Sequence, residues 1–240
     1  MLLACDASQL EWRVCLELSQ DWVGINEIIN GEDTHANNQR AFDLPSRLIA
    51  KIFLFRTIFR GSGWAFANDA DFTHVSSDPK FWDNLNEKFY AKYASLDKKH
   101  KEWMALVSAG KDITGPLGRS WHLDMGRDYK GELKLPLNQL VNLPVQGTGA
   151  DIMTIARISA YKRITKAGIP CDFISTVHDS IVVDTHTKYL ADLSAIFDSV
   201  FLDLPMNIKA LFGYEWQCPM ACESKYGPDM KNMKKMLTSK

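Results

Sequence analysis

Two acidic segments, far apart in the chain, contain residues that could carry out chemistry. They are residues 6–13, with the sequence DASQLEWR, and residues 177–180, with the sequence VHDS. If Asp6 and Asp179 meet on neighbouring strands of one sheet, their carboxylates can share a pair of Mg²⁺ ions. Two such ions hold an attacking hydroxyl and a leaving pyrophosphate in line, as phosphoryl transfer requires. An isolated aspartate is more often a turn residue, so this prediction depends on both segments together.

A basic and aromatic stripe lies between the two segments. Pro45 suits the first turn of a helix, and the pattern from Ser46 to about Arg60 is helical. Four side chains recur at every fourth position of that helix: Arg47, Lys51, Phe55 and Phe59. Two cations near a helix N-terminus can bind a triphosphate, and an aromatic ring can stack on a base. The alternative is a solvated basic face that continues into core phenylalanines.

Strands and helices must position these residues. Residues 2–6 predict a buried strand that leads into a helix, and its partner strands must come from later in the chain or from another polypeptide. Residues 173–184 predict a strand pair that reverses at residues 178–180. The other predicted elements are helices over 34–42 with Thr34 as N-cap, 81–107, 136–167 (a pair or one bent helix) and 189–201, two strands around 114–121, and a strand over 205–210.

Composition narrows the class of protein. The 240 residues are 46% apolar and 24% charged, which fits a globular unit with a real core. Five cysteines, an odd number, predict reduced thiols and a cytoplasmic protein, and no stretch suits a membrane span. The net charge is −1, so any nucleic-acid surface must be local; residues 40–60 hold five cations, Arg40, Arg47, Lys51, Arg56 and Arg60, against Asp43 alone.

The order and spacing of these segments resemble family A DNA polymerases, the DNA polymerase I group with its phage replicases. Residues 6–13 resemble motif A of that family, the stripe from Arg47 to Phe59 resembles motif B, and residues 177–180 resemble motif C. Asn142 with residues 146–148 resembles the minor-groove segment. The resemblance covers nearly the whole chain, with the motifs in the family's order.

This resemblance implies an α/β (α+β) fold with an antiparallel palm sheet and an inserted, mostly helical fingers subdomain. The expected domains are palm over 1–30 and 131–240 and fingers over 31–130. Because the chain starts at motif A, the thumb and the exonuclease domain are expected to be absent. Either the chain is the C-terminal piece of a split polymerase that assembles with a separate N-terminal polypeptide, or it is a truncated sequence. The split arrangement suggests a phage source, with the host cytoplasm as the location.

The resemblance also implies roles for individual residues. Asp6 and Asp179 would bind two Mg²⁺ ions, and Lys51 would act with them in catalysis. The deoxynucleoside triphosphate would contact Arg47, Phe55, Phe59, His35, Gln9 and Glu11, with Glu11 as the steric gate against a ribose 2′-hydroxyl. The primer-template DNA would contact Arg13, Asn142, Gln146 and His178. Alternatives for single residues are a turn histidine for His35, an exposed helix residue for Glu11, and internally bonded helix residues for Asn142 and Gln146.

The chain departs from the family pattern at four positions. Arg56 and Arg60 stand where the family usually has glycine, so they alter packing at the nascent base pair or add phosphate contacts. Phe59 replaces a tyrosine, and Ser180 replaces a glutamate near the metals.

The leading hypothesis is therefore a template-directed DNA polymerase catalytic portion that extends a primer. Three alternatives remain: a single-subunit RNA polymerase, a non-catalytic DNA-binding or assembly fragment, and a metal hydrolase built on His178-Asp179. Glu11 argues against the first, the joint presence of Asp6, Asp179, Arg47 and Lys51 against the second, and the β-branched flanking strands against the third.

Overall fold

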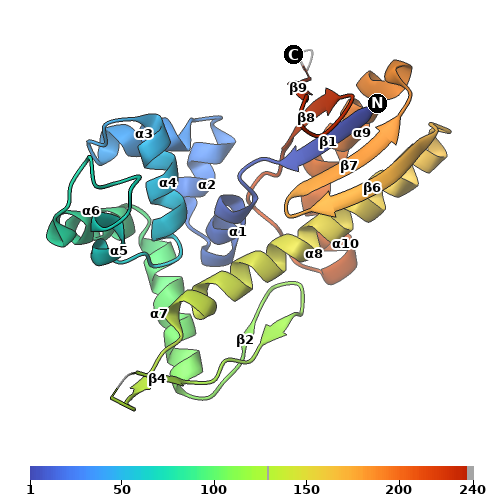
Figure 1. Ribbon diagram of the computed structural model, residues 1–240. Coiled ribbons are helices and arrows are strands. Elements are labelled where there is room, and N and C mark those ends of the chain that lie inside the picture. Colours follow the sequence, from blue (N-terminus) through green and yellow to red (C-terminus); the bar gives the residue numbers. More distant parts are fainter. Residues whose placement is uncertain (129, 237–240) are drawn as a thin grey trace. The chain divides into compact units, whose positions relative to one another are not determined.

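The computed structural model describes residues 1–128 and 130–236 and divides into two compact units (Figure 1). One unit is Met1–Glu11 with Gly147–Lys240, and the other is Trp12–Gln146. Both boundaries fall inside helices, α1 (Leu10–Ser19) and α8 (Leu137–Lys166). The sequence places them instead at 30/31 and 130/131. The first boundary lies early because the buried Trp12 ring packs against Phe89 and Tyr93 of the helical unit.

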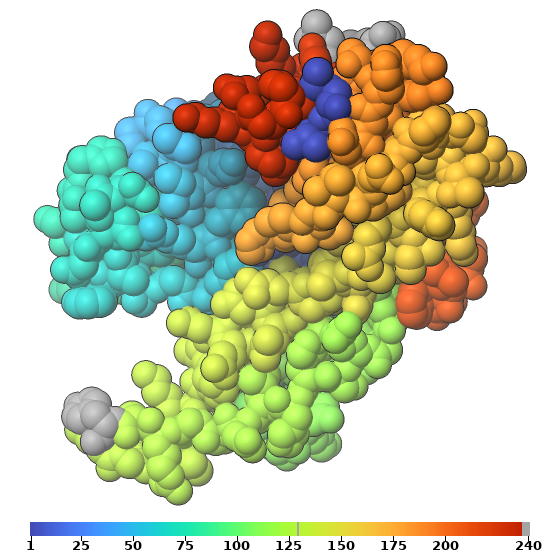
Figure 2. Space-filling view, turned by 45° about the vertical axis from the view of Figure 1, so that its right-hand side comes forward, coloured from blue at the N-terminus to red at the C-terminus, as the bar shows by residue number. Residues whose placement is uncertain are grey.

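The first unit is built on a five-stranded antiparallel sheet with the strand order β6-β7-β1-β8-β9. The strands are β1 (Leu2–Ala7), β6 (Cys171–Val177), β7 (Ser180–Thr185), β8 (Cys222–Gly227) and β9 (Lys234–Lys235). The first strand lies between β7 and β8, so both of its partners come from later in this chain. Figure 2 shows the start of the chain, in blue, flanked by the red and orange C-terminal strands. The predicted strand pair over 173–184 is confirmed as β6 and β7.

The helices of this unit are the second part of α8, the short 3-10 helix η1 (Thr187–Tyr189), α9 (Leu190–Leu202) and α10 (Leu204–Phe212). Tyr161 of α8 contacts Phe173 of β6, and η1 and α10 pack against α9. The α9 helix packs on β1 and β8, and its Asp198 accepts a hydrogen bond from the Cys222 thiol. Side chains alternate across a strand, so Leu3 and Cys5 face α9, and Asp6 faces the opposite side.

One predicted strand is wrong. Residues 205–210 lie inside α10, because Pro205 is tolerated in a first helical turn and Leu204 and Ile208, four residues apart, are both fully buried. Gly213 then ends the helix in the left-handed conformation, with φ 71°.

The second unit is mostly helical. Its helices besides α1 and the start of α8 are α2 (Trp22–Ile29), α3 (Thr34–Ala41), α4 (Arg47–Thr57), α5 (Gly63–Ala67), α6 (Pro79–Lys92) and α7 (Ala94–Ser108). Two small hairpins follow, β2 (Ile113–Thr114) with β3 (Ser120–Trp121) and β4 (Gly126–Arg127) with β5 (Leu133–Lys134). The core is aromatic: the fully buried Phe53 ring of α4 touches Phe42, Phe66, Trp82 and Phe89.

Helix ends in this unit differ from the sequence prediction at four places, one of which is the C-terminus of α4, at Thr57 instead of about Arg60. Asp33, not Thr34, caps α3, and Pro45 precedes Ser46, the N-cap of α4, instead of lying in its first turn. The predicted helix over 81–107 is two helices that break at Tyr93. The buried Tyr93 hydroxyl lies 3.1 Å from Glu27 Oε2 and 2.9 Å from Asn38 Oδ1, so tertiary contacts hold the break.

Candidate active site

The two aspartates come together on adjacent strands. Asp6, near the end of β1, is the register partner of Ser180 on β7, and Ala7 N donates a hydrogen bond of 2.8 Å to the carbonyl oxygen of Asp179. Asp179 lies in the two-residue turn between β6 and β7, after His178, whose φ is 53°. Histidine tolerates this left-handed conformation better than most residues. The turn leaves both His178 and Asp179 exposed beside Asp6.

A lysine that sequence reasoning missed lies at the same place. Lys225 Nζ, on β8, donates a hydrogen bond of 2.7 Å to Asp6 Oδ2. This hydrogen bond raises the pKa of Lys225 above its usual value, and the charges of Asp6, Glu223 and Asp179 act in the same direction. The only sequence signal was the alternation of Glu223 and Lys225, in a strand whose Cys, Ser and Gly residues give little strand propensity.

The donor set fits a hard cation. No group of three or more His, Cys, Asp or Glu side chains among residues 1–128 and 130–236 is arranged to hold a metal ion by itself. Two carboxylates nevertheless suit Mg²⁺, which keeps several waters and is usually bound by one or two carboxylates together with substrate phosphates. Asp6 and Asp179 are therefore the residues that could hold such an ion in this unit.

Gln9 and Glu11 follow Asp6 in the same unit. Gln9 lies in the turn between β1 and α1 with φ 52°, and within the described part of the chain its buried Oε1 has no hydrogen-bond partner. Glu11 is partly buried in the first turn of α1, where the helix dipole favours a carboxylate. An unpartnered buried amide oxygen leaves Gln9 able to accept a hydrogen bond from a ligand or a water.

In the helical unit, the start of α4 is joined to the start of α3. Ser46 caps α4, and Arg47 Nε donates a hydrogen bond of 2.6 Å to Asp33 Oδ2. The other oxygen of Asp33 accepts from the backbone nitrogens of His35 and Ala36 at 3.0 and 3.1 Å. The hydrogen bond from Arg47 lowers the pKa of Asp33. One carboxylate thus fixes Arg47 against the turn that carries His35.

His35 is buried beside these cations. Its side chain is 2% exposed, its ring lies 6.1 Å from the Phe55 ring, and its Nδ1 has no hydrogen-bond partner within the described residues. Burial lowers the pKa of His35 to about 4, and the charges of Arg47 and Lys51 add to that effect. The alternative for His35, a surface turn histidine, is wrong because the residue is buried at the start of α3. The structure brings together His35, Arg47, Lys51 and Phe55, a neutral imidazole next to two cations and a ring.

The remaining motif residues are placed as follows. Lys51 is exposed one turn after Arg47. Phe59 is partly exposed and lies two residues beyond Thr57, the end of α4, so the predicted stripe leaves the helix before its last member. Asn142 is half-buried and Gln146 exposed, four residues apart on one face of α8, so their side chains are neighbours. Arg13 is partly buried on α1.

The two unusual arginines are both held in ion pairs with acidic side chains of the helical unit. Arg56 pairs with Asp69 and, at 3.7 Å, with Asp71. Arg60, at φ 60°, donates to Asp97 at 2.7 Å and to His100 Nδ1 at 3.0 Å.

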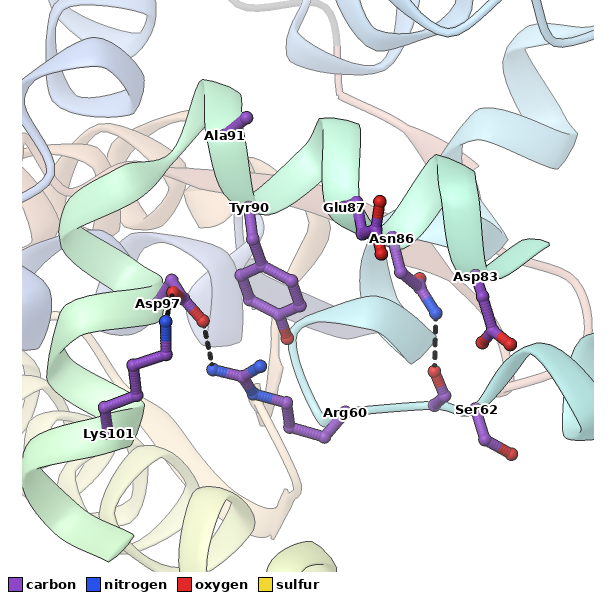
Figure 3. A pocket seen from close by; sticks show the side chains of 10 residues that line it. Arg60, Ser62, Asp83, Asn86, Glu87, Tyr90, Ala91, Asp97 and Lys101 are labelled. Carbon is purple, nitrogen blue, oxygen red and sulfur yellow. Dashed lines mark hydrogen bonds and ion pairs between the residues drawn. The ribbon is translucent and has the colours of Figure 1, made fainter. Parts of the chain in front are cut away.

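Figure 3 shows the Arg60 side chain between Tyr90 and Asp97. The guanidinium carbon of Arg60 lies 4.1 Å from the centre of the Tyr90 ring. These residues line a cavity of about 720 Å³. Because Arg56 and Arg60 pair with acids outside residues 40–60, the net positive charge around this segment is smaller than its sequence suggests.

Membrane-spanning segments are not found: none of the described helices is both long and apolar enough to cross a bilayer.

Comparisons with known proteins agree with this arrangement. A model of DNA polymerase family A matches residues 1–218. DNA polymerase I of Aquifex aeolicus is 24% identical over 228 residues, which are 88% of this chain and 38% of that protein. DNA polymerase I of Lactococcus lactis subsp. cremoris is 25% identical over 232 residues, which are 90% of this chain and 26% of that protein. The chain thus spans less than half the length of these relatives.

Among solved structures, the fold is similar to the POL domain of Pol1 from M. smegmatis in a complex with DNA primer-template and dNTP. The TM-score is 0.77 at 20% identity, over 94% of this chain and 39% of that one. The predicted mixed fold, an antiparallel sheet with an inserted helical region, is confirmed. Since the family model matches most of the chain, this chain belongs to DNA polymerase family A.

Proposed function

We propose that this chain is the catalytic portion of a template-directed DNA polymerase, which adds deoxynucleotides to the 3′-hydroxyl of a primer. One observation carries the proposal: Asp6 and Asp179 lie next to each other in a chain of family A. They are neighbours because Asp6 pairs with Ser180, the residue after Asp179. The solved neighbour contains primer-template DNA and a dNTP. Relatives named DNA polymerase I support the same activity.

In this proposal Asp6 and Asp179 hold two Mg²⁺ ions, which supply charge neutralisation and orientation for phosphoryl transfer. Lys51 and Arg47 bind the triphosphate, with Arg47 held in place by Asp33 and the α4 N-terminus favouring an anion. His35 offers a neutral ring nitrogen that has no hydrogen-bond partner among residues 1–128 and 130–236, and Phe55 beside it supplies a surface for the incoming base. Gln9 and Glu11, directly after Asp6, contact phosphate and sugar.

The finer assignments belong to the same proposal. The sheet unit acts as the palm and the helical unit as the fingers. Arg13, Asn142, Gln146 and His178 contact the DNA, through acceptors in the minor groove that all correct base pairs share. A phage replication setting, with the host cytoplasm as the location, completes the proposal.

A second candidate is a non-catalytic DNA-binding fragment of a split polymerase. Two observations favour it: Asp6 is paired with Lys225, and Ser180 stands directly after Asp179, where the family commonly has a glutamate. A protein that only holds DNA would still bind a primer-template but would not extend it.

Primer extension with Mg²⁺ separates these candidates. Extension by the purified chain, alone or with the polypeptide that supplies the remaining polymerase segments, supports the proposal if Asp179→Asn slows it at least about a hundredfold, the scale expected for losing a metal ligand. Extension unaffected by this substitution would contradict the two-metal site. DNA binding without extension in both preparations would favour the second candidate, and efficient use of ribonucleotides would point to an RNA polymerase.

A further inference from the structure

The position of Lys225 follows from the register of the sheet. Lys225 lies opposite Ala4 on β1, and Asp6 lies two residues further along the same face of β1. A methyl group at Ala4 leaves room for the long lysine side chain to lean along the strand. Its ammonium therefore reaches Asp6 Oδ2 at 2.7 Å, a diagonal contact across two strands.

Lys225 pairs with Asp6, whereas the nearby acid Glu223 pairs with a different lysine. Glu223, directly opposite Asp6, is paired with Lys235 of β9 at 3.0 Å. On the other side of Asp6, the register partner on β7 is Ser180, a neutral residue. Asp6 thus lies between a hydroxyl and an ammonium, and Lys225 is 46% exposed while Asp6 is 30% exposed.

We infer that Lys225 is a positioning residue that acts as a tethered cation: it holds the Asp6 carboxylate until a divalent metal ion displaces it. The inference rests on the proposed function, because it takes Asp6 as a metal ligand. A hydrogen-bonded ammonium and a metal ion compete for the same carboxylate oxygen, so the ion pair must open before the metal binds there. Partly exposed ion pairs contribute little free energy, so the competition changes metal affinity modestly.

The test is Mn²⁺ binding to the folded chain, measured from the electron paramagnetic resonance signal of free Mn²⁺ without DNA or nucleotide. The variant Asp6→Asn defines the part of the binding that depends on Asp6. We expect Lys225→Gln to bind Mn²⁺ at that site about twofold to fivefold more tightly than the wild type, since the competing cation is gone. Lys225→Arg keeps a cation and is expected to bind like the wild type.

Lys234→Gln is the matched control, because it removes the same charge from strand β9 and leaves both the Lys235–Glu223 pair and the contact between Lys225 and Asp6 in place. An equal gain in affinity from Lys234→Gln would overturn the inference, since the effect would then be one of general charge.

Two other outcomes of the Mn²⁺ binding experiment distinguish the role of Lys225 from the proposed metal site at Asp6. If Asp6→Asn loses the site but Lys225→Gln leaves the affinity unchanged or weaker, only the tethered-cation role is wrong. If Asp6→Asn leaves Mn²⁺ binding unchanged, Asp6 is not a metal ligand, and both the proposed metal site and the role of Lys225 are wrong. Far-ultraviolet circular dichroism of each variant verifies that it is folded.

Discussion

Lys51 and Arg56 lie five residues apart on α4, in different surroundings. Arg56 is neutralised by Asp69 and Asp71 and lies over the Phe72 ring at 4.9 Å. Lys51 is exposed, and no ion pair joins it to another residue of the described ranges. The positive charge of Arg56 therefore stabilises the fold, whereas that of Lys51 remains available to bind an anion.

This difference gives a prediction for nucleotide use. Lys51→Ala is expected to reduce the rate of extension by about a hundredfold, the scale of losing one charged contact to a reacting group. Arg56→Ala is expected to lower the melting temperature but to leave the nucleotide KM within about twofold. Steady-state extension and thermal unfolding of both variants measure this. A large rise in the nucleotide KM for Arg56→Ala would show instead that Arg56 contacts the phosphates of the nucleotide.

His35 gives a prediction about pH. Burial lowers its pKa to about 4 in the folded protein, below the value of 6.5 for an unperturbed histidine. The unfolded chain therefore binds more protons between these values, and the stabilising contribution is complete above pH 6.5 and decreases as pH falls towards 4. For one such histidine the free energy of unfolding falls by about 2 kcal/mol between pH 7 and pH 5.

Urea unfolding of wild type and His35→Gln at both pH values tests this. The free energy of unfolding of the variant is expected to fall less between pH 7 and pH 5 than that of the wild type. Because each protein is compared with itself at the two pH values, a packing defect introduced by the substitution does not affect this comparison. His100, whose pKa burial lowers to about 3, continues to contribute in both proteins. Equal losses in the two proteins would show that His35 does not titrate as described.

At the scale of elements, helix ends are where local signals and tertiary contacts meet. Asp33 caps α3 through the backbone nitrogens of His35 and Ala36 and at the same time pairs with Arg47 at the start of α4. The sequence contains both Asp33 and Thr34 as possible caps. Aspartate is the stronger N-cap of the two, Thr34 is fully buried, and Asp33 also pairs with Arg47.

Substitutions of Asp33 separate its two roles. Asp33→Ala is expected to destabilise the chain by about 1–2 kcal/mol, because α3 loses its N-cap. Asp33→Asn keeps a capping oxygen and removes the charge, so its cost is expected to be below about 1 kcal/mol, as for other exposed ion pairs. Chemical denaturation gives both values. If the two substitutions cost the same, the ion pair and not the cap holds the turn.

At the scale of the whole molecule, each compact unit has its own core. Phe53 contacts aromatic residues only within Trp12–Gln146, whereas Leu3, Ile181, Val183 and Phe197 are fully buried in the sheet unit. Separate cores open as separate cooperative regions in hydrogen exchange.

Phe53→Ala tests this division. Truncating a fully buried phenylalanine costs about 3–5 kcal/mol. Hydrogen exchange measured by mass spectrometry is expected to become faster across residues 12–146, with much smaller changes in β1, β7 and β8. Phe53→Leu, a smaller change of volume, is the matched control. Uniform acceleration along the whole chain would mean that the two units unfold as one.

The sequence by itself determined the first strand, the β6–β7 hairpin and the helix that begins at Arg47, because these depend on short-range periodicity and turn residues. The family resemblance came from the quoted segments and their order. Asp6 and Asp179 could be paired in advance since their strands were recognisable. Only the tertiary structure decided that Arg56 and Arg60 are held in ion pairs and that the Lys225 ammonium contacts Asp6. These outcomes depend on contacts between residues distant in sequence, and strand β8 has no local signal strong enough to reveal its partner.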